Sequence, residues 1–211
     1  MRCRIFAVLI GFGLLLVPAF GQAKAPAETL KAYMDEVLDV FQQAGAEEAQ
    51  AMKRAKLREE LRRVAKQAFD FEIMARMCLG PHWSKLNQEQ QQEFIRLFIR
   101  LLEENYFGKI LQYVDDIKGY SRDQIDFTKE TVFSSRKAMV QSVIHYNDKQ
   151  VPVDYRLVSL DEGWKVYDVS VEGVSLVQNY RSQFRDMMLR MSPAEMLQTV
   201  REKVESQPEA S

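Results

Sequence analysis

The first half of the chain repeats its hydrophobic residues at steps of three and four, the spacing that places them on one face of a helix. One such stretch runs from Pro26 to Gln43 and stops before Gly45, and a second runs from Ala46 to about Ala68. The first stretch carries Leu30, Tyr33, Met34, Val37, Leu38 and Phe41. The pattern therefore predicts two helices before residue 69.

A denser apolar block follows these two helices. A short helical segment begins at Phe69 and ends at Gly80-Pro81, and the spacing of Asn87 and Gln90 is that of a capping box that opens a long helix. Only a thin polar edge interrupts this helix, so we expect it to be buried on most sides, either between a sheet and other helices or against a cavity. Its apolar residues are Phe94, Ile95, Leu97, Phe98, Ile99, Leu101, Leu102, Tyr106, Phe107, Ile110 and Leu111.

From Gln124 onward the hydrophobic period changes to two, which is typical of strands with one face on a core. The links between the alternating stretches are short, and Asn147-Asp148-Lys149 and Asp161-Glu162-Gly163 have hairpin chemistry. Four consecutive strands with such links predict an antiparallel meander. The alternating stretches are residues 125–128, 138–146, 151–157 and 164–171.

The run from Gly163 to Phe184 joins the last of these strands to a helix. Gly173 marks the turn, and Ser175 and Gln178 have the spacing of a capping box, so the helix is expected to open at Leu176. An apolar stripe then follows at helical steps, which predicts one buried face. The stripe consists of Val177, Tyr180, Phe184 and Met188.

A final helix is predicted from Pro193 to about Glu205, because Ser192 precedes the proline and Glu195 follows at the capping distance. The chain shows no internal repeat and no interdomain linker. We therefore expect residues 26–205 to form one α+β domain, a four-stranded antiparallel sheet wrapped by about six to seven helices, followed by a polar tail at 206–211.

The chain begins with the pattern of a secretory signal peptide. Arg2 and Arg4 precede an apolar stretch from Ile5 to Phe20, and Ala23-Lys24-Ala25 provides a small-x-small cleavage site. Residues 1–25 are therefore predicted to be removed on export, with cleavage after Gly21 and an uncleaved anchor helix as the alternatives.

Charge and cysteine content narrow the compartment and the class of partner. Residues 26–211 keep 26 of the 29 basic residues and all 30 acidic ones, a balance of about −4, which argues against a nucleic-acid binder. With Cys3 in the signal segment, Cys78 is left without an intramolecular disulfide partner. It is expected to be a buried small hydrophobe, with a reactive thiol as the alternative.

The middle of the second helix is strongly basic. Between Lys53 and Lys66 it carries seven Lys or Arg residues against Glu59 and Glu60. The simplest interpretation is a solvated face with internal ion pairs. The alternative is a surface, from about Arg54 to Lys66, that docks on acidic partners or anionic headgroups.

Residues with the spacing of a catalytic or metal site are scarce. Neither His82 nor His145 has a second ligand at zinc spacing, and there is no nucleophile elbow, phosphate loop or dinucleotide motif. Asp168 is expected to be a structural hydrogen-bonding residue rather than an acid or base. A triad of Ser170, His145 and Asp168 is possible but no spacing favours it. The chain is therefore predicted not to be an enzyme.

Three separated blocks of the chain resemble the MlaC family, also called the toluene-tolerance auxiliary family. They are GWKVYDVSVEGVSLVQNYRSQF, the earlier FDFEIMARMCLGPHWSKLNQEQQQEFIRLFIRLLEENYFGKI and the closing MSPAEML, and the likeness runs from about Pro26 to Leu197. The resemblance implies a monomeric periplasmic carrier that moves phospholipid between the outer and inner membranes. Its implied partners are an outer-membrane lipoprotein-porin complex and an inner-membrane ABC transporter with a substrate-binding ring.

The resemblance also implies that acyl chains lie in an apolar pocket between the sheet and the helices, with lipid as cargo and no cofactor. Flexible methionine side chains suit a pocket that alternates between empty and filled. A hopanoid-like cargo and a periplasmic acyl-ester hydrolase are the alternatives. The residues expected to contact lipid are Met74, Leu97, Leu101, Tyr106, Val143, Tyr155, Val166 and Val174.

Overall fold

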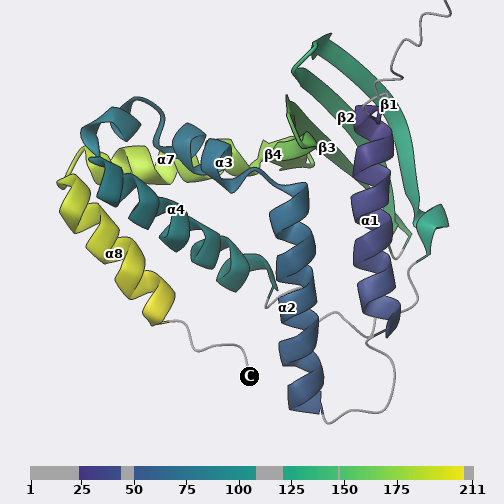
Figure 1. Cartoon of the computed structure of the whole chain (residues 1–211), viewed down its shortest axis with the longest axis horizontal. Coiled ribbons are helices and arrows are strands. Elements are labelled where there is room, and N and C mark those ends of the chain that lie inside the picture. Colours follow the sequence, from purple (N-terminus) through teal and green to yellow (C-terminus); the bar gives the residue numbers. More distant parts are fainter. Residues whose placement is uncertain (1–23, 44–49, 108–120, 147, 207–211) are drawn as a thin grey trace, which may run out of the picture.

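The computed structural model describes residues 24–43, 50–107, 121–146 and 148–206. Within this part of the chain, six α-helices accompany one antiparallel sheet (Figure 1). The helices are α1 (Pro26–Gln43), α2 (Gln50–Ala68), α3 (Phe71–Leu79), α4 (Gln88–Leu102), α7 (Leu176–Met188) and α8 (Pro193–Glu205). The strands are β1 (Ile125–Ser134), β2 (Lys137–Tyr146), β3 (Lys149–Leu160), β4 (Gly163–Val171) and β5 (Val174–Ser175).

The sheet has the strand order β1-β2-β3-β4-β5, with every neighbour antiparallel. The predicted meander is confirmed, but the prediction of four strands was wrong because the sheet has five. The fifth strand is only two residues long and pairs Ser175 with Ser170 and Val174 with Val171. A strand this short leaves no alternation in the sequence from which it could be recognised.

The helix starts follow the capping residues. The Asn87 and Ser192 side chains accept hydrogen bonds from the Gln90 and Glu195 amides, each in a full capping box. The Ser175 side chain likewise accepts from the Gln178 amide and starts α7 at Leu176, as predicted.

Helix α4 is shorter and more one-sided than its composition suggested. It ends at Leu102, and one turn of π-helix follows, Glu103–Phe107. Phe94 and Phe98 are fully buried while Arg96 and Arg100 are exposed. The expectation of burial on most sides was too broad, because it counted Tyr106 and Phe107, which belong to the π turn, and residues 110 and 111, which lie outside the described residues.

Three apolar clusters hold these elements together. The first joins α3, α4, α7 and α8, the group on the left of Figure 1, and the second joins α1 to the inner face of the sheet. The third joins α1 to α2 through Val40 and Phe41 on one side and Leu57, Leu61 and Val64 on the other. Helices α2 and α4 thus belong to different clusters, and α2 stands between the sheet side and the helical group (Figure 1).

Cys78 lies in the first cluster, fully buried, with its thiol donating to the Val177 carbonyl at 3.7 Å. This confirms the expectation of a buried small hydrophobe. Burial raises the pKa of the thiol from 9.0 to about 12, so the thiolate that reacts with disulfide reagents is suppressed in the folded protein.

We therefore expect a thiol reagent at pH 9 to label Cys78 of the native protein lacking residues 1–25 only at the rate of unfolding, and to label it at once in denaturant. Because the folded pKa is raised, the burial of Cys78 stabilises the fold fully below about pH 9 and progressively less as the pH rises through about 12. Rapid labelling of the native protein would contradict the packing described above.

Candidate functional site

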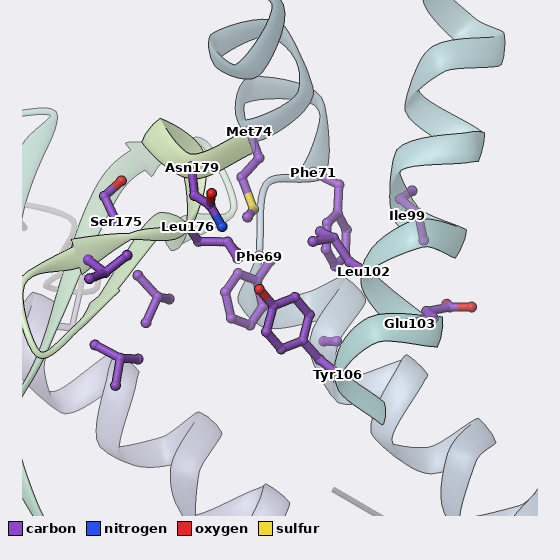
Figure 2. A pocket seen from close by; sticks show the side chains of 14 residues that line it. Phe69, Phe71, Met74, Ile99, Leu102, Glu103, Tyr106, Ser175, Leu176 and Asn179 are labelled. Carbon is purple, nitrogen blue, oxygen red and sulfur yellow. The ribbon is translucent and has the colours of Figure 1, made fainter. Parts of the chain in front are cut away.

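A cavity of about 440 Å³ lies where the sheet meets the helical group (Figure 2). This is a typical size for a small-molecule pocket, which spans roughly 300–1,000 Å³. Side chains from α3, α4 and the start of α7 point into it (Figure 2). The lining consists of Ala65, Phe69, Phe71, Met74, Ile99, Leu102, Glu103, Tyr106, Val169, Val171, Val174, Ser175, Leu176 and Asn179.

The sheet contributes its part of this wall through a β-bulge in β4. Leu157 pairs with Val166, but Arg156, the residue before Leu157 in β3, pairs with Asp168. Tyr167 is therefore an extra residue in β4. The bulge reverses the alternation that follows: Tyr155 and Val153, on the inner face, now lie opposite Val169 and Val171. Without the bulge, Asp168 and Ser170 would face the cavity instead.

A two-residue turn then carries the chain back along the cavity wall. Glu172 and Gly173 both have positive φ, 50° and 82°, as a tight hairpin of this twist requires. Glycine adopts this conformation without steric cost. The turn places Val174 beside Val171, and both side chains line the cavity.

Asp168 fixes the start of α7 against the sheet. Its side chain is almost fully buried, accepting from the Val177 amide at 3.1 Å and from the Ser175 hydroxyl at 2.7 Å. Ser175 in turn accepts from the Gln178 amide at 3.0 Å. This chain of hydrogen bonds orients the first turn of α7, which presents Leu176 and Asn179 to the cavity.

The facing wall comes from α3, α4 and the π turn. Asp70 caps α3 by accepting from the Ile73 amide, and its own amide donates to the Val166 carbonyl, which ties the α2–α3 junction to β4. The Phe69 and Phe71 rings stack beside this junction at 5.8 Å between centroids. Together with Met74, they form an apolar surface that can adapt to a ligand.

The cavity offers apolar contact and little charge. Of the described residues that line it, none is cationic, and the single carboxylate, Glu103, is bound by Arg62 through two hydrogen bonds of 2.7 and 2.8 Å. At the rim, Tyr106, Val171 and Val174 remain 40%, 44% and 66% exposed. Burial of its ring raises the pKa of Tyr106, so the hydroxyl stays neutral. Such a lining suits an aliphatic ligand.

The family model described as MlaC protein matches residues 31–202. The chain belongs to the MlaC family. A curated relative, toluene tolerance protein ttg2D of Pseudomonas putida, is 30% identical over 107 residues, which cover 50% of this chain and 46% of the relative. The match thus spans less than half of that relative's length.

This MlaC protein also shares its fold with a solved structure, a phospholipid-binding protein from Ralstonia solanacearum in complex with a phospholipid. The alignment has a TM-score of 0.71 at 23% identity and covers 87% of this chain and 99% of the other. At this level of identity the likeness concerns the fold.

The structure brings three of the eight predicted lipid-contacting residues of this MlaC protein to the cavity: Met74, Tyr106 and Val174. Leu97 and Leu101 are buried in the cluster of α4 with α3, α7 and α8, and Tyr155 and Val166 are buried on the inner sheet face. Contact with lipid stays a prediction for all of these residues.

Val143 lies on the outer face of the sheet, away from the cavity. It pairs with Asp126 and Pro152, whereas Ser142 beside it pairs with the inward Val153. The alternation along β2 was readable in the sequence, but which of its two faces meets the helices was not.

The sequence reasoning missed much of the lining. Phe69 and Phe71 were assigned to the short helical segment predicted to begin at Phe69, yet Phe69 precedes α3 and Phe71 is its first residue. Val169 and Val171 face the cavity only because of the bulge, and the hydrophobic pattern of the sequence does not predict a bulge there. A signal was present for Leu176, because Ser175 predicts that α7 opens with this residue at the sheet edge.

The polar residues considered for catalysis are not assembled. Asp168 lies opposite Arg156, whose β2 partner Met139 is six residues from His145, a separation of about 20 Å along the strand. His145 is at 2.8 Å from Asp126 on the outer face. Within the described residues there is no group of His, Cys, Asp and Glu that could hold a metal ion.

The predicted signal segment, residues 1–25, lies outside the described residues except for Lys24 and Ala25. Across the ranges that are described, no helix combines the length and the apolar character needed to cross a membrane.

In the basic helix, ion pairs occupy part of the surface considered for docking. Arg58 and Arg62 bind Glu104 and Glu103, and Arg63 binds Glu36 and Glu60.

Proposed function

We propose that this protein is a periplasmic carrier that holds the acyl chains of a phospholipid in the cavity between β4–β5 and the helices. The observation that carries the proposal is the cavity itself, which is large, almost wholly apolar and open along an apolar rim. Membership of the MlaC family and the phospholipid bound by the Ralstonia protein of the same fold support it.

A carrier of this kind removes a large energetic barrier. Moving a phospholipid with about 30 tail methylenes through water costs on the order of 25 kcal/mol, at about 0.8 kcal/mol for each methylene. Phe69, Phe71, Met74, Leu102 and Leu176 offer a surface that replaces the lost tail contacts. The described lining contains no cationic side chain that could bind a phosphate. We therefore expect weak headgroup selectivity, with the headgroup at the exposed rim.

The remaining parts of the role follow from the family resemblance. We propose that residues 1–25 direct export, that residues 26–205 act as one domain and that the protein works as a monomer without a cofactor. It would exchange lipid with an outer-membrane lipoprotein-porin complex and an inner-membrane ABC transporter, and so maintain outer-membrane lipid asymmetry. A hopanoid-like lipid is the alternative cargo, because the lining would offer it the same apolar contacts.

The test is the identity of what the protein holds after purification. We expect the mature protein, expressed into the periplasm of a bacterial host, to retain phospholipid that solvent extraction and mass spectrometry identify. An unrelated periplasmic protein taken through the same steps is the control for carry-over. Repeated recovery of stripped protein that also takes up no added phospholipid or hopanoid would exclude the proposal.

A further inference from the structure

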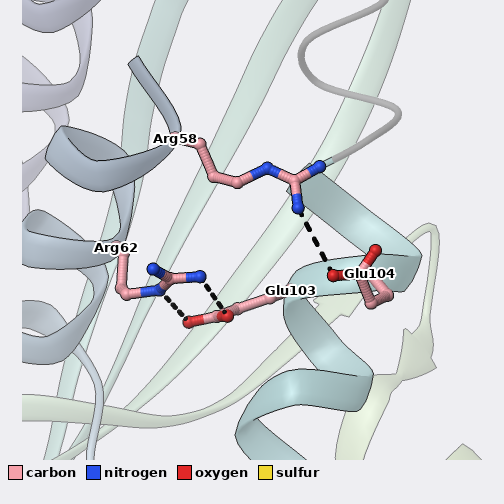
Figure 3. Close-up of polar contacts among 4 residues, drawn as sticks. All are labelled: Arg58, Arg62, Glu103 and Glu104. Carbon is pink, nitrogen blue, oxygen red and sulfur yellow. Dashed lines mark hydrogen bonds and ion pairs between the residues drawn. The ribbon is translucent and has the colours of Figure 1, made fainter. Parts of the chain in front are cut away.

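Two adjacent ion pairs connect α2 to the π turn that carries Tyr106 (Figure 3). Arg58 and Arg62 are four residues apart and therefore project from the same face of α2. Glu103 and Glu104 are consecutive at the point where α4 ends. The Arg62 guanidinium donates a hydrogen bond to each carboxylate oxygen of Glu103, and Arg58 Nη1 lies at 3.3 Å from Glu104 Oε1.

The two pairs join α2 to the end of α4, two helices whose buried residues belong to different apolar clusters. Leu57, Leu61 and Val64 of α2 pack on α1, whereas the buried residues of α4 pack on α3, α7 and α8. On the other side of α2, its junction with α3 is tied to β4 by the hydrogen bond from the Asp70 amide to the Val166 carbonyl. Helix α2 is thus held to β4 by a backbone hydrogen bond at its end and to the π turn by charged side chains.

Glu103 also belongs to the cavity wall, and Tyr106 follows it by three residues at the rim. The Glu103 side chain is 9% exposed and the Arg62 side chain 39%, so water reaches this pair from the Arg62 side only. The hydrogen bonds that Arg62 donates to Glu103 raise the pKa of the Arg62 guanidinium. Arg58 makes the weaker connection, because it reaches Glu104 through one bond of 3.3 Å and its Nη2 is buried without a hydrogen-bond partner.

We propose that the Arg62–Glu103 pair, assisted by Arg58–Glu104, is a latch that holds the Tyr106 wall against α2 and limits the rate at which lipid enters and leaves. The proposal rests on the proposed function. Arg62 acts as a positioning residue: it contacts the wall and not the ligand. Opening the latch detaches the π turn from α2 without disturbing the apolar cluster in which α4 is packed.

Charge reversal tests the latch. A phosphatidylethanolamine with a fluorophore on one acyl chain is loaded, and its release to excess acceptor vesicles is followed by stopped-flow fluorescence. Arg62→Glu leaves the buried Glu103 carboxylate facing a second carboxylate, and Glu103→Arg leaves Arg62 facing a second guanidinium. Each variant is therefore expected to release the probe at least about tenfold faster. The double variant Arg62→Glu/Glu103→Arg should return to within about threefold of the original rate.

Arg63→Glu is the matched control, because Arg63 lies next to Arg62 on α2 but pairs with Glu36 and Glu60 away from the cavity. Its release rate should be unchanged. Folded single variants that release the probe at the original rate, or a double variant as fast as the singles, would overturn the latch. Glu103→Gln, which removes the charge without introducing repulsion, covers the case in which a reversal variant fails to fold.

Hydrogen exchange without lipid separates this proposal from the proposed function. Amides of residues 103–107 should exchange at least about tenfold faster in Arg62→Glu and recover in the double variant. That result in a protein that takes up no lipid would show that the pair holds the π turn on α2 and would reject the carrier. Unchanged exchange in a protein that does bind lipid would reject the latch and leave the carrier intact.

Discussion

Replacing Tyr106 with glutamate is expected to empty the cavity without unfolding the protein. Tyr106 lines the cavity but is 40% exposed, so a carboxylate at this position can reach water in the unloaded protein. With an acyl chain in place the same carboxylate would lose much of its hydration beside methylenes. Such desolvation costs at least about 2–3 kcal/mol, which lowers lipid affinity by roughly 30-fold to 150-fold.

The measurement is lipid recovered per mole of purified protein, together with the melting temperature. Tyr106→Phe should keep its lipid, because the ring and its apolar contacts are retained. Leu189→Glu is the control for added charge, since Leu189 is 72% exposed and is not part of the cavity lining. A folded Tyr106→Glu protein with the original lipid content would show that the acyl chains lie elsewhere.

The elements of this fold were predictable where local chemistry decides them. The capping residues Asn87, Ser175 and Ser192 each begin a helix at the expected position. The hairpin between β3 and β4 turns at Asp161 and Glu162, and Gly173 turns the chain into β5. Each of these features depends on hydrogen bonds or dihedral angles within a few residues, and such interactions leave a clear pattern in the sequence.

The cavity was harder to predict because tertiary structure determines which apolar residues remain uncovered. The bulge at Tyr167 brings Val169 and Val171 to the inner face, and the end of α4 at Leu102 brings Tyr106 to the rim. Neither shift has a signature in the hydrophobic pattern. Leu97 and Leu101 have the same character as Ile99 and Leu102, yet they do not line the cavity, because they lie on a different side of α4.

The bulge also explains why a buried acid occupies β4. It turns Asp168 away from the cavity and toward the amide groups at the start of α7, where a carboxylate satisfies donors that the helix cannot. The same shift makes one wall of the cavity apolar and anchors the helix that completes it. Asp168 thus supports the cavity through the position of Leu176 and Asn179 without facing a ligand.

Asp168→Ala is accordingly expected to destabilise the protein by roughly 3 kcal/mol, because it leaves the buried Val177 amide and the Ser175 hydroxyl without their acceptor. For a domain of this size that corresponds to a fall in melting temperature of about 10 °C. Arg156, at 3.9 Å and largely exposed, contributes little to the effect. Thermal unfolding followed by circular dichroism measures the loss.

Two milder variants separate a structural role for Asp168 from a catalytic one. Asp168→Asn keeps an acceptor for the Val177 amide, and Ser175→Ala removes the cap and one donor to Asp168 but leaves the Val177 bond in place, so each should cost about 1–2 kcal/mol. A hydrolase that used Asp168 as its acid or base would lose all turnover of an acyl ester in Asp168→Asn while staying folded. If Asp168 is structural, lipid content should instead decline in the order of the stability losses, so that Asp168→Ala retains the least lipid. The reason is that each variant loosens the first turn of α7 to a different extent.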